Sequence, residues 1–177
     1  MKIDKPICSL VWRIRCNKSE FLKQWTISPC ACNFFHGASK GNPGLSGTGG
    51  LIFSPDRLTV TSFSRGLGKM SNNQAESYSL LKACQLAKEV GFKYLRVYWD
   101  SEILIKMLNS DGLFNIPALK VILKRIRTIL KDFEQVEFFH ILRDLNGTTN
   151  SLANVACLLA QGYLSLNGEA SLFQPIP

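Results

Sequence analysis

The stretch NFFHGASKGNPGLSGTGGLIFS, residues 33–54, decides how this chain folds. Apolar runs at residues 32–35 and 51–53 flank a glycine-rich segment with Asn-Pro-Gly at its middle. Proline presets φ and glycine accepts φ > 0, so Asn-Pro-Gly is typical of a turn. The pattern predicts a β-hairpin with a long, glycine-tolerant connection. Such a connection is either a place where backbone approaches a phosphate or a base closely, or a plain surface turn.

The chain after this hairpin predicts a mixture of strands and helices. Residues 58–64 alternate as a half-buried strand, so three strands with short links form an antiparallel meander. A helix then starts at Ser71 or Asn72 and runs to about residue 90, where Gly91 closes it. A strand at residues 94–99 and a helix at 102–109 follow, and this rhythm implies a parallel strand beside the meander.

The second half of the chain continues with helix, strand and helix. Residues 117–133 form a long amphipathic helix, residues 135–142 a fifth strand and residues 150–163 a last helix. The amphipathic helix carries a basic stripe that reads either as a solvated face or as a set of phosphate contacts. Its members are Lys120, Lys124, Arg127 and Lys131, with Arg125 beside it.

The domain organisation follows from these elements. Residues 31–163 are expected to form one domain, and residues 164–177 an irregular tail. Residues 1–30 show no clear period apart from a short helix at about residues 17–25, capped by Asn17 or Ser19. We expect this segment to be an arm or linker that docks on the domain.

Composition indicates the class of partner. The chain has 177 residues, of which 46% are hydrophobic, enough for one compact domain with a substantial core. Its net charge of +8 favours a polyanionic partner, nucleic acid before membrane. No apolar run approaches the length of a membrane span, and we find no signal peptide. We therefore expect an intracellular protein with reduced thiols, in the nucleus or the cytoplasm.

Two acidic residues fall at positions that need an explanation. Glu76 shares a helix face with Leu80, Ala83 and Ala87, so it is a carboxylate on a face that must meet the core. The alternative is a solvated glutamate that the helix dipole favours. Asp100 follows a strand directly and is either a functional carboxylate or the N-cap of the next helix.

Four motifs in order make residues 31–160 resemble type 1 ribonuclease H, especially the version in plant retroelement polyproteins. The motifs are Phe35-x-Gly37-Ala38-Ser39-x-Gly41-Asn42-Pro43-Gly44, Asn73-Gln74-Ala75-Glu76, Trp99-Asp100-Ser101, and Arg143-x-x-Asn146 followed by Leu152-Ala153-Asn154-x-Ala156. The resemblance implies an α/β ribonuclease H-like fold, with a mixed five-stranded sheet of order 3-2-1-4-5 flanked by helices. It also implies hydrolysis of the RNA strand of RNA–DNA hybrids by two Mg²⁺ ions that four carboxylates hold.

This chain departs from the family pattern at two of those four positions. It keeps Glu76 and Asp100 as metal ligands but has His36 at the first position and Asn150 at the fourth. Mg²⁺ prefers oxygen ligands, whereas an imidazole nitrogen prefers softer metals and has one lone pair, so it cannot bridge two ions. We therefore expect binding of the family cofactor, Mg²⁺ or Mn²⁺, to be weakened and hydrolysis to be weak or lost, as in a decaying element copy.

Binding of an RNA–DNA hybrid or duplex is expected to be less affected, because the family reads its duplex by shape. The matching contact positions are Gly37, Ala38, Ser39, Asn42, Asn72, Asn73 and Gln74, to which the basic stripe adds phosphate contacts. Two alternatives stay open. One is a working ribonuclease in which His36, Glu76 and Asp100 hold a softer ion such as Mn²⁺. The other is a non-catalytic interaction module of a retroelement polyprotein.

Overall fold

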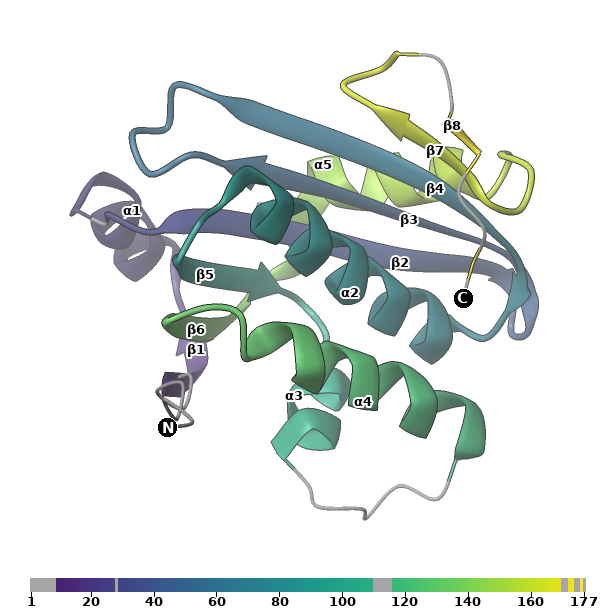
Figure 1. Cartoon of the computed structure of the whole chain (residues 1–177), viewed down its shortest axis with the longest axis horizontal. Helices are drawn as coiled ribbons and strands as arrows, with labels where there is room; N and C mark the ends of the chain where they lie inside the picture. Colours follow the sequence, from purple (N-terminus) through teal and green to yellow (C-terminus); the bar gives the residue numbers. More distant parts are fainter. Residues whose placement is uncertain (1–8, 28, 110–115, 170–171, 174–175, 177) are drawn as a thin grey trace, which may run out of the picture.

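The computed structural model describes residues 9–27, 29–109, 116–169, 172–173 and 176 (Figure 1). Within these residues, one mixed sheet runs in the order β1-β6-β5-β2-β3-β4-β7-β8. Its strands are β1 (Ser9–Cys16), β2 (Ala31–Gly41), β3 (Gly44–Phe53), β4 (Val60–Met70), β5 (Tyr94–Trp99), β6 (Gln135–Ile141), β7 (Tyr163–Leu166) and β8 (Leu172–Phe173). The helices are α1 (Lys18–Ile27), α2 (Asn72–Val90), α3 (Glu102–Asn109), α4 (Pro117–Leu130) and α5 (Gly147–Ala156), with a short 3-10 helix, η1 (Arg143–Asn146).

The predicted fold class is confirmed. Strands β4, β3, β2, β5 and β6 are neighbours in that order, which is the expected order 3-2-1-4-5. The pairs β2–β3 and β3–β4 are antiparallel, whereas β5 lies parallel to both β2 and β6. The sheet is wider than predicted, because β1 extends one edge and β7 and β8 extend the other.

The prediction of a long loop inside the hairpin was wrong. Strands β2 and β3 stay paired as far as Gly41 and Gly44, so the turn consists of Asn42 and Pro43. The glycines within the strands let helices approach the sheet closely. A Cβ atom on Gly49 would lie 2.5 Å from the backbone nitrogen of Ala153 in α5, a distance that no side chain tolerates. Glycine here therefore indicates helix packing rather than a loop.

The end of the chain also differs from the prediction. The last helix begins at Gly147 and ends at Ala156, short of the predicted residue 163. The chain then turns at Gly162, which has a φ of 87°, and returns as β7 along β4. The expectation that residues 164–177 are irregular was therefore wrong for β7 and β8. Strand β4 is likewise longer than the predicted strand at residues 58–64.

The main core lies between the sheet and the helices α2, α3 and α4, which sit together on one side of it in Figure 1. Helix α2 has the predicted ends. Ser71 is its N-cap and forms a capping box with Gln74, and Gly91 closes it in the left-handed conformation. No helix among the described residues is long and apolar enough to cross a bilayer. Four cysteines are buried free thiols: Cys30, Cys32, Cys84 and Cys157.

The N-terminal segment packs against the opposite side of the sheet through α1. The predicted cap is confirmed, because the backbone nitrogen of Glu20 donates to Asn17 Oδ1 at 2.9 Å and Asn17 donates back to Glu20. The rings of Phe21 and Trp25 lie 5.8 and 6.0 Å from that of Phe34 in β2. Strand β1, which the sequence did not predict, pairs in parallel with β6.

Candidate active site

The sheet opens at one point, and three candidate residues meet there. Strand β5 pairs with β2 only as far as Phe34 and Tyr98, so no strand among the described residues pairs with the rest of β2 on that side. His36 lies on this unpaired part of β2, and Asp100 follows the end of β5 directly. Glu76 reaches the same point from the first turns of α2. A crevice at the carboxyl ends of parallel strands is a common place for ligands.

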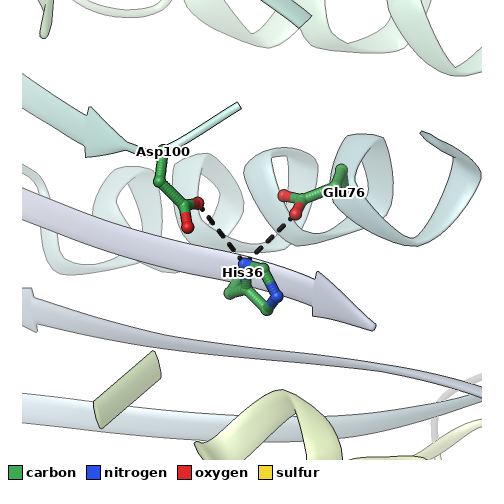
Figure 2. A group of neighbouring side chains, drawn as sticks. All are labelled: His36, Glu76 and Asp100. Carbon is green, nitrogen blue, oxygen red and sulfur yellow. Dashed lines mark ion pairs between the residues drawn. The ribbon is translucent and has the colours of Figure 1, made fainter. Parts of the chain in front are cut away.

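His36 lies between the two carboxylates. Its Nδ1 atom is 3.2 Å from Glu76 Oε1 and 3.5 Å from Asp100 Oδ1, as Figure 2 shows. One ligand atom from each of the three residues falls within 4.8 Å of the others. Glu76 is buried, as its shared face with Leu80 predicted, and the other two are half-buried. We call His36, Glu76 and Asp100 the floor of the site.

Burial and mutual attraction set the charge state of the floor. Burial raises the pKa of Glu76 to about 7. Burial acts to lower the pKa of His36, but the Asp100 and Glu76 carboxylates outweigh it, so that this pKa lies above its usual 6.5. Burial acts to raise the pKa of Asp100, and His36 together with Asn146 outweighs that effect, which leaves this pKa below 3.8. Glu76 and His36 therefore hold protons more tightly than the isolated groups do.

Asn146 ties the floor to the start of α5. It is 1% exposed, and its Nδ2 atom donates to the carbonyl oxygen of Phe35 at 2.9 Å and to Asp100 Oδ1 at 3.4 Å. Its side-chain oxygen accepts a hydrogen bond from the Thr149 hydroxyl. Asn150 comes directly after Thr149 in α5 and lines the same pocket as the floor. The four positions that the resemblance singled out thus lie around one pocket.

This pocket is open and has a volume of about 590 Å³. Four of the residues predicted to contact nucleic acid line it: Ala38, Ser39, Asn72 and Asn73. The other three residues of the quoted motifs that were predicted to contact nucleic acid are not among its lining residues: Gly37, Asn42 and Gln74.

Those three have structural contacts of their own. A Cβ atom on Gly37 would overlap the backbone of Ala75 in α2, so this glycine lets the helix approach β2. Asn42 Oδ1 accepts from the backbone nitrogen of Asn72 at 3.1 Å, and Gln74 belongs to the α2 capping box.

The predicted basic stripe lies away from the pocket. Lys120, Lys124 and Arg127 are exposed on α4, and none of them is among the residues that line the pocket. Arg127 donates to the carbonyl oxygen of Leu108 in α3 at 3.3 Å. Any phosphate contact of this stripe would therefore be outside the site itself.

Four lining residues were not predicted as site residues: Ser101, Ile103, Arg143 and Asn154. Arg143 and Asn154 belong to the last quoted motif, so that motif was the signal that could have found them. Asn154 also follows Asn150 by four positions, which places both on one face of α5. We call the polar residues around the opening the rim of the site: Ser39, Asn72, Asn73, Arg143, Asn150 and Asn154.

The floor and Asn150 do not fit a pair of Mg²⁺ ions. Two such ions carry a charge of +4, against which Glu76 and Asp100 supply −2. The Nδ1 atom of His36 lies 3.2 Å from Glu76 Oε1, so it stands where a metal ion would contact this carboxylate. An imidazole also cannot bridge two hard ions. Asn150 offers a neutral oxygen where the family has a carboxylate. The three floor residues do suit a single, softer ion.

Comparison with known proteins places the chain in a family. The family described as reverse transcriptase-like matches residues 34–156. Ribonuclease HI of Halobacterium salinarum is 33% identical over 123 residues, which is 70% of this chain and 62% of that protein. The bifunctional protein Rv2228c of Mycobacterium tuberculosis is 26% identical over 121 residues, which is 68% of this chain and 33% of that protein. The chain thus spans less than two thirds of these curated relatives.

Solved structures agree with this placement. The crystal structure of RNase H1 from Halobacterium salinarum has a TM-score of 0.68 at 32% identity, covering 71% of this chain and 96% of that one. LC11-RNase H1, solved in complex with an RNA/DNA hybrid, has a TM-score of 0.63 at 26% identity and covers 72% of this chain and 96% of that one.

Proposed function

The chain belongs to the reverse transcriptase-like family as a type 1 ribonuclease H-like domain, and from this premise we propose that it binds RNA–DNA hybrids but hydrolyses them weakly or not at all. The observation that carries the proposal is the position of His36. Its Nδ1 atom lies within 3.5 Å of both retained carboxylates, so an imidazole occupies the space between the groups that would otherwise share metal ions. A cation held between two carboxylates competes with any metal for them.

Hybrid binding draws support from the parts of the site that have not changed. Ser39, Asn72 and Asn73 line the pocket with hydroxyl and amide groups, which suit contacts with ribose hydroxyls and phosphates. The hydroxyl of Ser39 is held in place because it donates to the carbonyl oxygen of Met70 at 2.9 Å. The net charge of +8 adds attraction to a polyanion. The solved relative that binds an RNA/DNA hybrid shares the fold.

The test compares binding and cleavage in one labelled hybrid. The native chain and a variant that carries both His36→Asp and Asn150→Asp are assayed with Mg²⁺, with Mn²⁺ and with a chelator. We expect the native chain to bind hybrid without measurable Mg²⁺-dependent cleavage. We expect the double variant to cleave it, because four carboxylates then surround the metal site. Double-stranded DNA and single-stranded RNA of the same sequence are the controls for hybrid specificity.

Three results would contradict the proposal. Full Mg²⁺-dependent cleavage by the native chain would make it a working ribonuclease. Absence of hybrid binding by the native chain at low salt would favour an interaction module without a nucleic-acid function. A double variant that binds hybrid and Mg²⁺ but stays inactive would mean that His36 and Asn150 are not the cause of the loss.

A second candidate function rests on the floor geometry. One ligand atom each from His36, Glu76 and Asp100 lies within 4.8 Å of the others, so one ion could reach all three, and carboxylate ligands suit Mn²⁺. Under this alternative, Mn²⁺ but not Mg²⁺ supports slow cleavage, and His36→Ala abolishes it. The division of the chain into arm, domain and tail stays a prediction, as do its retroelement origin and its compartment.

A further inference from the structure

We propose that the rim binds a phosphodiester group of nucleic acid directly, without a metal ion, through the Arg143 guanidinium and the Asn150 amide. This inference rests on the proposed function, because the ligand is a phosphate of the bound hybrid. It adds that the two changed positions have altered the kind of ligand that this pocket takes. In the family pattern the pocket binds metal ions that contact the phosphate, whereas here the side chains of the rim bind the phosphate directly.

Arg143 is the cation of the rim. It lies in η1 and lines the pocket, yet its side chain is exposed and makes no hydrogen bond or ion pair with another described residue. Its backbone is well placed, because Asn146, at the other end of the same short helix, is buried and bound to the carbonyl oxygen of Phe35. A guanidinium with a fixed base and free donors matches the two oxygens of a phosphodiester.

Asn150 supplies a neutral donor beside this cation. The side chain of Asn154 donates to Asn150 Oδ1 at 3.3 Å and to the Asn150 carbonyl oxygen at 2.9 Å. The amide oxygen of Asn150 is therefore occupied, and its NH₂ group is left to donate toward a ligand. An aspartate at this position would accept hydrogen bonds only and would repel a phosphate. The replacement thus exchanges a metal ligand for a phosphate donor.

The floor does not prevent this binding. Glu76 and Asp100 would repel a phosphate, but both carboxylates face His36, at 3.2 and 3.5 Å from its Nδ1 atom. Asp100 also accepts from Asn146. The pocket has a volume of about 590 Å³, and the positive charge of Arg143, which also acts on Glu76, offsets part of the repulsion from the floor. A free phosphate has the same chemistry, but the charge of +8 favours the phosphate of a polymer.

The test measures hybrid affinity by fluorescence anisotropy over a range of salt, in chelator and in Mg²⁺. The variants are Arg143→Gln, Arg143→Lys and Asn150→Asp, and the matched control is Lys93→Gln. Lys93 is exposed just before the start of β5, whereas Asp100 follows its end, so the control removes one charge away from the site. Thermal unfolding of each variant verifies that it is folded.

We expect the native chain to bind hybrid equally well in chelator and in Mg²⁺. In chelator, Arg143→Gln should weaken binding by about 5–30-fold and reduce the slope of log affinity against log salt by about one phosphate contact. Asn150→Asp should weaken it by about 3–10-fold under the same conditions, because it places a negative charge beside the ligand. Arg143→Lys should fall between native and Arg143→Gln, and Lys93→Gln should change affinity less than twofold.

Several outcomes would overturn the inference. If the native chain binds hybrid but Arg143→Gln resembles Lys93→Gln, the proposed function stands and the phosphate site at the rim does not. The same holds if binding requires a divalent metal. If millimolar inorganic phosphate raises the melting temperature of the native chain in an Arg143-dependent way while hybrid affinity ignores Arg143, the pocket takes free phosphate. If the native chain binds no hybrid, both the inference and the proposed function are wrong.

Discussion

The floor and the rim of the site differ in what holds them. The floor consists of groups that are largely buried and depend on one another, since His36 lies between Glu76 and Asp100. The rim consists of half-exposed or exposed polar groups, such as Arg143 and Asn154, that contact solvent. A substitution in the floor is therefore expected to change the stability of the fold, whereas one in the rim is expected to leave stability nearly unchanged. Under the proposed function, this difference is the physical reason why catalysis and binding respond to different substitutions.

The sharpest way to break this comparison is to restore one carboxylate in each region. In chelator, His36→Asp should lower the free energy of unfolding by about 1–4 kcal/mol, because it replaces the partner of two carboxylates with a third one. Asn150→Asp, at the half-exposed rim, should change it by less than about 0.5 kcal/mol. Urea unfolding measures both. Equal stability of native and His36→Asp chains in chelator would contradict the mutual dependence of the floor.

The second-largest expected effect concerns Asn146, which connects the floor to the start of α5. Asn146→Ala should cost about 1–3 kcal/mol of unfolding free energy, because it removes the donor that its side chain gives to the buried Phe35 carbonyl oxygen and one of the donors to Asp100. Asn154→Ala, which removes an amide on the exposed side of α5, is the matched control and should cost less than about 0.5 kcal/mol. Similar costs for the two variants would mean that Asn146 does not join floor and rim.

The pH dependence of stability comes from the floor. Folding raises the pKa of Glu76 from 4.5 to about 7 and the pKa of His36 above 6.5. The proton that each group binds therefore stabilises the folded state fully below the unfolded pKa. This part of the free energy of unfolding is lost as pH rises through the folded pKa. The lowered pKa of Asp100 works in the opposite direction, but only as pH falls through its folded value, below 3.8. Raising pH from about 5.5 to 8.5 should therefore cost about 1–2 kcal/mol that a Glu76→Gln, His36→Gln double variant does not lose. Urea unfolding at each pH measures this loss, and an equal loss of unfolding free energy in the native chain and the double variant would refute the pKa shifts.

The smallest expected effect concerns the basic stripe on α4. A Lys120→Gln, Lys124→Gln double variant should weaken hybrid binding by about 2–5-fold at low salt and not at all at high salt, because both lysines lie outside the pocket. Stability should stay the same, since both side chains are exposed. A loss larger than that of Arg143→Gln would move the main contact with nucleic acid from the rim to α4.

Local signals explain what the sequence predicted well. The capping residue Ser71 and the closing Gly91 fix the ends of α2 with contacts inside one segment. The helical period then places Glu76 on the buried face, and the end of β5 places Asp100 beside it. The floor could therefore be assembled from periodicity together with the family resemblance.

The errors come from interactions between distant segments. Gly49 reads as a loop residue until α5, about a hundred positions later, is packed against it. Strand β1 forms because β6 offers a free edge, and no pattern within residues 9–16 indicates that. Composition and periodicity give Arg143 no signal, because an exposed arginine after a strand is ordinary until the pocket is assembled around it, and only its place in the last quoted motif points to it.

The docking of α1 matters for anyone who shortens this chain. The family match begins at residue 34, so a fragment cut there would lack the helix that covers part of the sheet. Phe34 and Tyr98, which are stacked at 4.9 Å under Phe21, would then face water. An aromatic surface of this kind favours self-association. Soluble expression is therefore expected to require the residues of α1, although they lie outside the part that identifies the family.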